Sequence, residues 1–181
     1  VTFVAVIPFI VSKYMIRYQD DLDFRNILLQ KIKIFVFFSN LILFVFLFLL
    51  ANQIRLFLKI ESLTPIYIFI FLIFLNVIYT LYDSILQGLR MYVTHAMQST
   101  VLVFIRLLFI LLLVVYLSHS YNAALLSQIL ATIIVIGFIY QISRKTTRVT
   151  NKNINIPRKI YKEMFHSSIP VALTWGTLII I

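Results

Sequence analysis

The chain has 181 residues, of which 62% are hydrophobic and 12% are charged, and it contains no cysteine. This composition excludes a soluble globular domain, disulfide bonds and thiolate metal sites, and it indicates a membrane protein. The net charge of +10 would suggest a nucleic-acid partner in a soluble protein, but its basic residues gather in alternate connections, so we assign them to membrane topology and expect no nucleic acid.

Apolar blocks follow one another along the chain, and most of them are long enough to cross about 30 Å of hydrocarbon as helices. No block alternates as a barrel strand does, so the sequence predicts an all-α, polytopic bundle of transmembrane helices. The predicted spans cover residues 1–11, 34–51, 66–82, 97–117, 121–142 and 167–181. The first and last blocks are short, so we expect the chain to be a segment of a longer membrane protein.

Basic residues in the connections predict the orientation of the spans. The connections 12–33, 83–96 and 143–166 together carry thirteen Lys and Arg residues, whereas the two connections between them carry two. Because Lys and Arg are retained on the cytoplasmic side during insertion, these three connections are predicted to be cytoplasmic. Anionic lipid is a further expected partner of this positive charge.

Two connections have helical features of their own. In 12–33, apolar residues recur at helical spacing, which favours an interfacial helical extension. In 143–166, Pro157 precedes a stretch in which Ile160 and other apolar residues alternate with basic ones. This pattern predicts a linker followed by a short amphipathic helix on the cytoplasmic surface, and a solvated loop that only sets topology is the alternative.

A stripe of polar residues runs along the block 66–82 and beyond it. Asn76, Thr80, Asp83 and Gln87 are spaced i, i+4, i+7 and i+11, so a helix of 100° per residue places all four on one face. Polar groups at this depth must face protein or water, and we expect the stripe to face the interior of the bundle. The alternative for Asn76 and Thr80 is that they only join neighbouring helices by hydrogen bonds.

The helix that carries this stripe is expected to end in the stretch "DSILQGLRMY" (83–92). Gly88 is suited to close the helix, and Arg90 then lies beside the negative end of the helix dipole. Asp83 lies near the headgroups in this reading, where it is expected to pair with Arg90 or Lys13.

Arg106 lies inside the block 97–117, about 13 Å beyond its start. Insertion of Arg at such a depth costs about 2.5 to 3.5 kcal/mol, so the side chain requires an anion or water. His95, Ser99 and Arg106 share one helix face and predict a polar track from the cytoplasmic mouth to the middle of the membrane. Arg106 is interpreted as an anion site in a central cavity, or alternatively as a residue that snorkels or pairs with a carboxylate of another helix.

Further polar pairs occur in the last two blocks. Gln128 and Thr132 are spaced i, i+4, and Gly137 is expected to allow close helix approach. The last block contains Ser167, Pro170, Thr174 and Thr177. These residues are interpreted either as part of a polar path or as ordinary helix packing.

Catalytic and metal-binding signals are not found in the sequence. The three histidines have no partner at ligand spacing, and a chain with three glycines holds no glycine-rich phosphate loop. We therefore expect no metal, no cofactor and no enzymatic activity.

These features resemble the oligosaccharide flippases of the polysaccharide-transport branch of the multidrug/oligosaccharidyl-lipid/polysaccharide exporter superfamily. The resemblance rests on "YDSILQGLRMY" (82–92), on "VLVFIRLLFILLLVV" (101–115) with its embedded Arg106, and on the basic connection that leads to "SSIPVALTWGTLII" (167–180). Members of this family have two six-helix bundles. The resemblance implies that residues 1–142 form the N-terminal bundle from the end of its second helix, that 143–166 is the cytoplasmic connection, and that 167–181 starts the second bundle.

The resemblance also implies a function. It implies translocation of an undecaprenyl-diphosphate-linked oligosaccharide across the bacterial inner membrane by alternating access, for lipopolysaccharide O-antigen or capsule biosynthesis, alongside other glycan-assembly membrane proteins. Arg106 would meet the diphosphate. The expected path residues are Asn76, Thr80, Asp83, Gln87, Ser99, Gln128 and Thr132. Alternatives are a drug or cation antiporter of the same superfamily, a polytopic membrane enzyme of glycan assembly, and a structural membrane subunit.

Overall fold

The computed structural model describes residues 2–118, 121–147, 156–157, 160, 162–163 and 166. In these residues the chain is helical and contains no strand. The helices are α1 (Thr2–Arg17), α2 (Leu22–Leu58), α3 (Thr64–Gly88), α4 (Tyr92–Ile110), which continues as the wider π-helical η1 (Leu111–Ser118), and α5 (Tyr121–Thr146). The predicted last span and its Ser167, Pro170, Thr174 and Thr177 lie outside the described residues.

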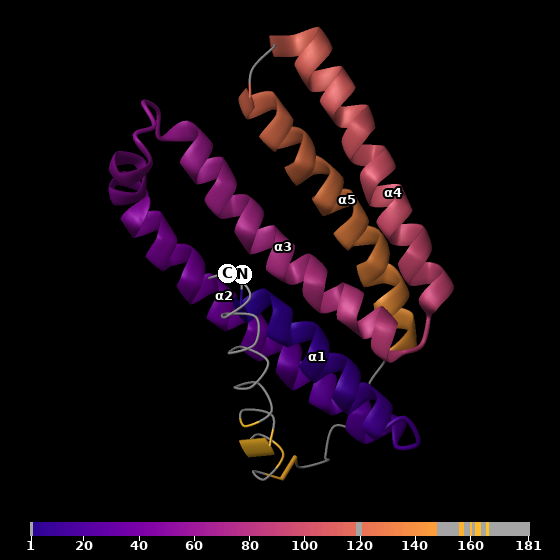
Figure 1. Ribbon diagram of the computed structural model, residues 1–181. Helices are drawn as coiled ribbons and strands as arrows, with labels where there is room; N and C mark the ends of the chain where they lie inside the picture. The colour runs from indigo at the N-terminus through magenta and orange to yellow at the C-terminus, as the bar shows by residue number, and fades with distance from the viewer. Residues whose placement is uncertain are drawn as a thin grey trace, which may run out of the picture.

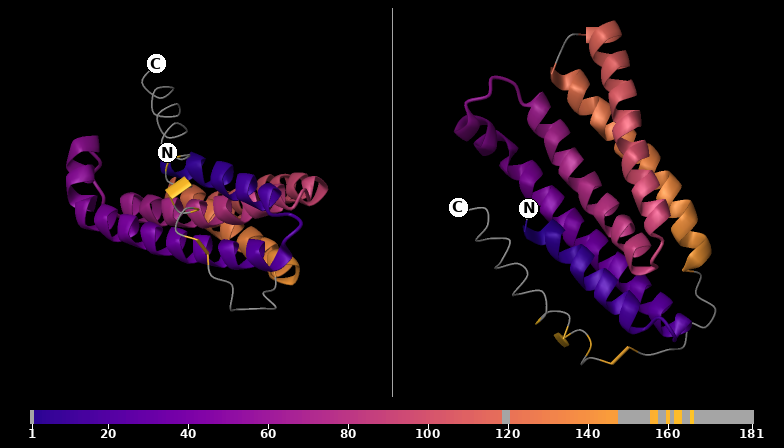
Figure 2. Two further views of the ribbon diagram at one scale, coloured as in Figure 1. Left: turned by 90° about the horizontal axis from the view of Figure 1, so that it is seen from below. Right: turned by 45° about the vertical axis from the view of Figure 1, so that its right-hand side comes forward.

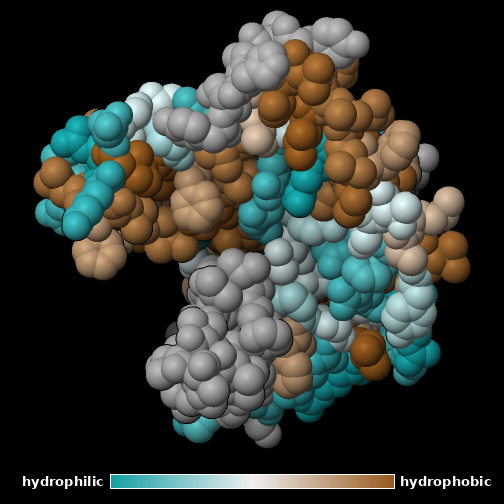
Figure 3. Space-filling model, turned by 45° about the horizontal axis from the view of Figure 1, so that its top comes forward, coloured by the Kyte–Doolittle hydropathy of each residue, from teal (hydrophilic) through white to brown (hydrophobic). Residues whose placement is uncertain are grey.

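Four of the helical segments are long and apolar enough to cross a membrane. They are Leu22–Leu58, Thr64–Gly88, Tyr92–Val115 and Asn122–Arg144. Broad apolar areas cover much of the surface and are interrupted by polar patches (Figure 3), and Phe57, Leu49 and Phe35 are exposed by 84%, 75% and 68%. Such apolar surface is stable against lipid and not against water. The predicted fold class, an all-α polytopic membrane bundle, is confirmed.

Helix α3 is the centre of the bundle. It packs against α1, α2, α4 and α5, while α4 also packs along α5 (Figure 1). The α1–α2 turn, the α3–α4 turn and the C-terminal end of α5 lie at one end of the bundle, and the α2–α3 turn lies at the other (Figures 1 and 2). We call the first of these the basic end, because the three connections predicted to be cytoplasmic leave the helices there.

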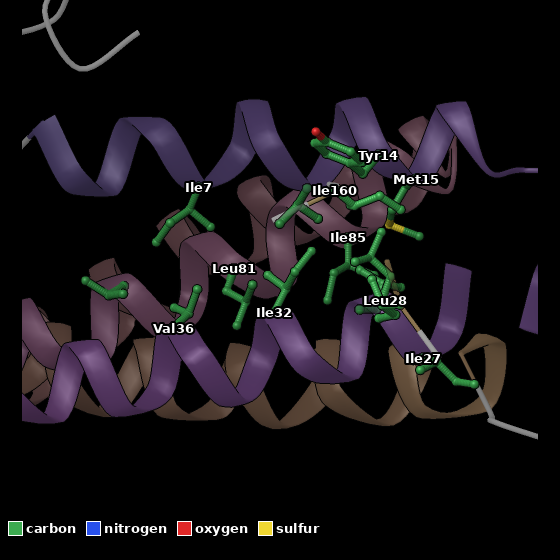
Figure 4. Close-up of a cluster of buried hydrophobic side chains, with 14 residues drawn as sticks. Ile7, Tyr14, Met15, Ile27, Leu28, Ile32, Val36, Leu81, Ile85 and Ile160 are labelled. Atoms are coloured by element: carbon green, nitrogen blue, oxygen red, sulfur yellow. The ribbon is translucent and has the colours of Figure 1, made fainter. Parts of the chain in front are cut away.

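The largest apolar core lies near the basic end, between α1, α2 and α3 (Figure 4). Val11, Tyr14 and Met15 of α1 are almost completely buried there against residues of α2 and α3. Ile156 and Ile160 of the basic connection join the same core. The connection therefore packs back on the bundle at these two residues.

Gly88 permits the close approach of α1 and α3. A Cβ atom at this position would lie 2.8 Å from both Cβ and Sδ of Met15, a separation that real Cβ atoms do not tolerate. Gly88 is the last residue of α3, as expected, but the left-handed conformation that commonly follows a helix end is adopted by Arg90, with φ 58°. The missing side chain of Gly88 thus serves helix packing, and the expected cap role belongs to the turn after it.

Helix α2 differs from its sequence prediction. Residues 22–33 were expected to belong to a connection with an interfacial helix, but they are the first turns of one continuous helix. Asp21 caps this helix by accepting a hydrogen bond from the Phe24 amide at 3.0 Å. Leu28 and Ile32 are buried against α1 and α3. This burial holds the segment in line with the rest of α2 instead of along the membrane surface.

Gly137 also differs from its prediction. It was expected to allow two helices to approach closely, but a Cβ atom there would have no neighbour within 4 Å. Contact between α3 and α5 instead uses large side chains, with Leu72, Leu75 and Ile129 buried in one cluster.

Candidate functional site

Four polar side chains meet where α3 ends and α4 begins. Asp83 Oδ1 lies 2.6 Å from His95 Nδ1 and also accepts a hydrogen bond from Gln98 Nε2. Asp83 Oδ2 accepts a hydrogen bond from Gln87 Nε2 at 3.0 Å. We call these four residues the carboxylate cluster. Both oxygens of the carboxylate therefore have protein partners.

The pairing of Asp83 differs from the expectation of a contact with Arg90 or Lys13. The short turn after Gly88 folds α4 back along α3, and it is closed by a hydrogen bond from the Met91 amide to the Leu86 carbonyl at 3.0 Å. This return places the face of α4 with His95 and Gln98 opposite Asp83. Arg90 itself lies exposed in the turn.

The carboxylate cluster is continued along α3 and α4 by Tyr79 and Ser99. The Tyr79 hydroxyl lies close enough to Ser99, Asp83 and Arg106 to interact with all three. Ser99 Oγ also donates to the His95 carbonyl at 3.0 Å. The predicted shared face of His95, Ser99 and Arg106 on α4 is therefore the face turned toward Tyr79 and Asp83 of α3.

Arg106 is the contrasting member of this face. Its Nε atom is buried and has no hydrogen-bond partner. Among the described residues, the ion pairs are Arg17–Glu163 and His95–Asp83, and none includes Arg106. Arg106 lies about 13 Å beyond the start of the predicted span 97–117 at the rise of an α-helix. A guanidinium group therefore lies deep in the membrane without a protein anion in the described part of the chain.

The predicted pair Asn76 and Thr80 lies on α3, further from the basic end. Thr80 Oγ1 donates to the Asn76 carbonyl at 2.8 Å, so this hydroxyl proton is used within the helix. No hydrogen bond between described residues uses the partly exposed Asn76 side chain. The residue that joins helices here is instead Asn40 of α2, which is buried and donates from Nδ2 to the Phe74 carbonyl at 2.9 Å.

The predicted pair Gln128 and Thr132 lies on α5. Thr132 Oγ1 donates to the Gln128 carbonyl at 2.8 Å, and Thr132 is 1% exposed. Thr132 therefore packs inside the bundle, whereas Gln128 is partly exposed. The structure does not bring this pair into the carboxylate cluster.

Two residues of the site, Tyr79 and Gln98, are absent from the sequence prediction. Tyr79 lies four residues before Asp83, and Gln98 lies three residues after His95, so the helical repeat places both beside residues of the predicted polar faces. This spacing is the signal that was available in the sequence.

Chemically, the site combines a bonded carboxylate with a deep, unneutralised cation. Within the described ranges, no group of three or more His, Cys, Asp or Glu side chains is placed to hold a metal ion.

Comparison with known proteins finds a matching family. The model of a family described as "Polysaccharide biosynthesis protein" matches residues 4–180. No curated protein and no solved structure matches the chain.

Proposed function

We propose that the chain, which belongs to the polysaccharide biosynthesis protein family, is part of a flippase that moves a lipid-linked oligosaccharide across the bacterial inner membrane by alternating access. Its substrate would be a polyprenyl diphosphate that carries a sugar repeat unit. The observation that supports this proposal most strongly is the deep position of Arg106 and its buried, unpartnered Nε atom.

A diphosphate accounts for the unsatisfied charge of Arg106. The planar guanidinium group binds phosphate oxygens through two parallel N–H bonds, and it remains charged in an apolar environment. A substrate that brings its own anion into the membrane would neutralise Arg106 only while it passes. Because no carboxylate of the described residues neutralises Arg106, its charge remains available to attract the diphosphate.

Neutral polar side chains of α3, α4 and α5 suit the sugar part of such a substrate. Asn76 and Gln128 are partly exposed amides with both donors and acceptors, and Ser99 and Tyr79 contribute hydroxyl groups, of which that of Tyr79 interacts with Arg106. Sugar hydroxyls are recognised by such neutral groups. We include these residues in the proposed path, and we place the chain among transporters rather than enzymes.

The same geometry makes a cation antiporter less suitable. An antiporter for cations needs an acid that is available to its substrate. Asp83 is the acid next to the proposed path, and both of its oxygens are already bonded to His95, Gln98 and Gln87. A cationic substrate would have to displace these partners and would also be repelled by Arg106.

The proposal can be tested in vesicles that contain the full-length protein and a labelled polyprenyl-diphosphate oligosaccharide in both leaflets. A glycosidase added outside is expected to digest about half of the labelled lipid without transport and nearly all of it when wild-type protein exchanges the leaflets. Arg106→Leu is expected to slow the exchange, whereas Arg55→Leu removes a positive charge outside the site and should leave the rate unchanged. Equal digestion with and without wild-type protein would overturn the proposal.

A further inference from the structure

We infer that Lys33 is the centre of a binding site for the phosphate group of a lipid, at the basic end of the bundle and separate from Arg106. This site does not depend on the proposed flippase activity, because a lipid phosphate can bind there whether or not the protein transports a substrate. Lys33 lies on α2, and its side chain reaches across α3 toward α5.

Two neutral side chains hold the Lys33 ammonium group in place. Nζ donates a hydrogen bond to Ser143 Oγ of α5 at 3.3 Å. It also lies 5.1 Å from the centroid of the Tyr82 ring of α3, and Tyr82 is held edge-on against Tyr140 with centroids 5.9 Å apart. Helices α2 and α5 flank α3 without packing against each other (Figure 1). The side chain of Lys33 therefore connects two helices that otherwise do not meet.

Neither contact neutralises the ammonium group. The ion pairs in the described part of the chain are Arg17–Glu163 and His95–Asp83, so no carboxylate of these residues offsets the charge of Lys33. An ammonium group has three N–H donors, and Ser143 takes one of them. Ser143 is fully buried while Lys33 is partly exposed. An anion would therefore approach Lys33 from its exposed side, and Ser143 and Tyr82 act as positioning residues.

The depth of this cluster matches the level of lipid phosphates. Lys33 directly precedes the predicted span 34–51, Tyr82 is the last residue of the span 66–82, and Ser143 directly follows the span 121–142. The three residues come from different helices and lie together at the predicted edge of the hydrocarbon. Basic and aromatic side chains at this level commonly contact headgroups.

Apolar surface beside Lys33 favours a lipid over free phosphate. On the side of α2 that carries Lys33, the following turns present Phe37 and Leu41, which are exposed by 47% and 38%. A ligand whose phosphate binds Lys33 can lay an acyl or prenyl chain along these side chains. The ligand is therefore amphipathic, with a phosphate at one end and hydrocarbon at the other.

The test measures binding of phosphatidylglycerol to the full-length protein in detergent by native mass spectrometry. Lys33→Gln is expected to weaken binding by about tenfold, the loss of one charge-assisted hydrogen bond, and Lys33→Arg should largely restore it. Lys31→Gln is the matched control, because Lys31 is exposed on the same helix, and it should change binding by less than about twofold. Ser143→Ala is expected to weaken binding by about threefold, and it keeps the test valid if Lys33→Gln does not fold.

Two further probes distinguish the source of the phosphate. If Lys33→Gln weakens phosphatidylglycerol binding, the site holds a bilayer headgroup; if it weakens only the binding of a sugar-free polyprenyl diphosphate, the site holds the carrier lipid. Either result supports a lipid phosphate at Lys33. Unchanged binding of both lipids, an equal loss in Lys31→Gln, or inorganic phosphate that binds as tightly as the lipids would overturn the inference. None of these readouts requires transport, so they stay informative if the flippase proposal fails.

Discussion

The face of α4 that meets the carboxylate cluster also carries Arg106. The charge of Asp83 has protein partners, whereas that of Arg106 has no ion-pair partner among the described residues. Asp83 is bonded through both oxygens to three side chains of α3 and α4. Arg106, further along the same helix, has a buried Nε atom without a partner. The first arrangement holds two helices together, whereas the second leaves an unmet demand for an anion.

Structural and functional polar groups of this bundle therefore differ in whether protein atoms satisfy their hydrogen bonds. When a polar group that is hydrogen-bonded to other protein groups is removed, the folded protein loses stability, because the partners of that group are left unsatisfied. When an apolar residue replaces an unpaired charge, no partner is left unsatisfied, so this loss of stability does not occur. Stability and transport are therefore expected to respond in opposite directions at these two sites.

The largest expected effect on stability is a gain at Arg106. Arg106→Leu removes a charge whose insertion costs about 2.5 to 3.5 kcal/mol at the centre of a membrane helix, and no ion pair between described residues is lost. Thermal unfolding of the full-length protein in detergent should show a raised midpoint. A midpoint lowered as much as by loss of Asp83 would show that structural partners hold Arg106 as well.

The next effect is a loss at Asp83. Asp83→Leu leaves His95 and Gln98 without their acceptor, which is expected to cost about 1 to 3 kcal/mol. Asp83→Asn keeps an acceptor oxygen in place and should cost less. The same unfolding measurement checks both variants. Equal stability of Asp83→Leu and wild type would show that the cluster does not join α3 to α4.

A somewhat smaller loss is expected at Gly88, which positions the end of α3 that carries Asp83. Gly88→Ala forces a Cβ atom to within 2.8 Å of Met15, and such overpacking costs about 1 to 2 kcal/mol. Gly137→Ala is the control, because its new methyl group meets open space and gains helix propensity. If both variants unfold at the same temperature, the close α1–α3 contact is not tight in solution.

The smallest effect is expected at the ion pair between Arg17 and Glu163. Arg17 Nη1 lies 3.0 Å from Glu163 Oε2, and the side chains are 51% and 36% exposed. The hydrogen bond to Glu163 raises the pKa of Arg17 above its usual value. The stability that a group with a raised pKa contributes is lost only when the pH rises through that pKa. Arg17 therefore stays charged, and keeps its contribution, throughout the neutral and mildly alkaline range. Arg17→Gln should therefore lower the unfolding midpoint by a small amount that is constant from pH 7 to about 9. High salt should remove the difference by screening; a difference that persists in high salt would contradict this view of the pair.

Much of the fold could be predicted because hydropathy and helical spacing depend on local sequence. The spans, the alternation of basic connections and the shared face of His95, Ser99 and Arg106 all follow from such local patterns. The sequence predicts a connection for residues 22–33 because their charged residues lower the mean hydropathy of the segment. The apolar face that α2 buries there is therefore not recognised from hydropathy. Spacing shows which residues share a face, but it does not show which helix that face meets.

The partners of individual residues were less predictable for the same reason. The partners of Asp83 depend on how the α3–α4 turn folds back, and the opposite roles of Gly88 and Gly137 depend on what lies across from each. Lys33 looked like one more topological charge, because only the packed helices bring Tyr82 and Ser143 to it. The proposed roles in a substrate path stay predictions for every residue of that path: Asn76, Thr80, Asp83, Gln87, Ser99, Arg106, Gln128 and Thr132.

The most direct test of the central claim, that Arg106 serves an anion in transit, is transport in cells. In a strain that lacks its own exporter, the full-length protein, Arg106→Leu and Arg106→Lys would be compared for surface glycan and for lipid-linked repeat units held in the inner leaflet. We expect Arg106→Leu to accumulate lipid-linked units inside and to lose surface glycan at normal protein level, with Arg106→Lys retaining part of the export. Equal export by all three proteins would contradict the account and make Arg106 a structural residue.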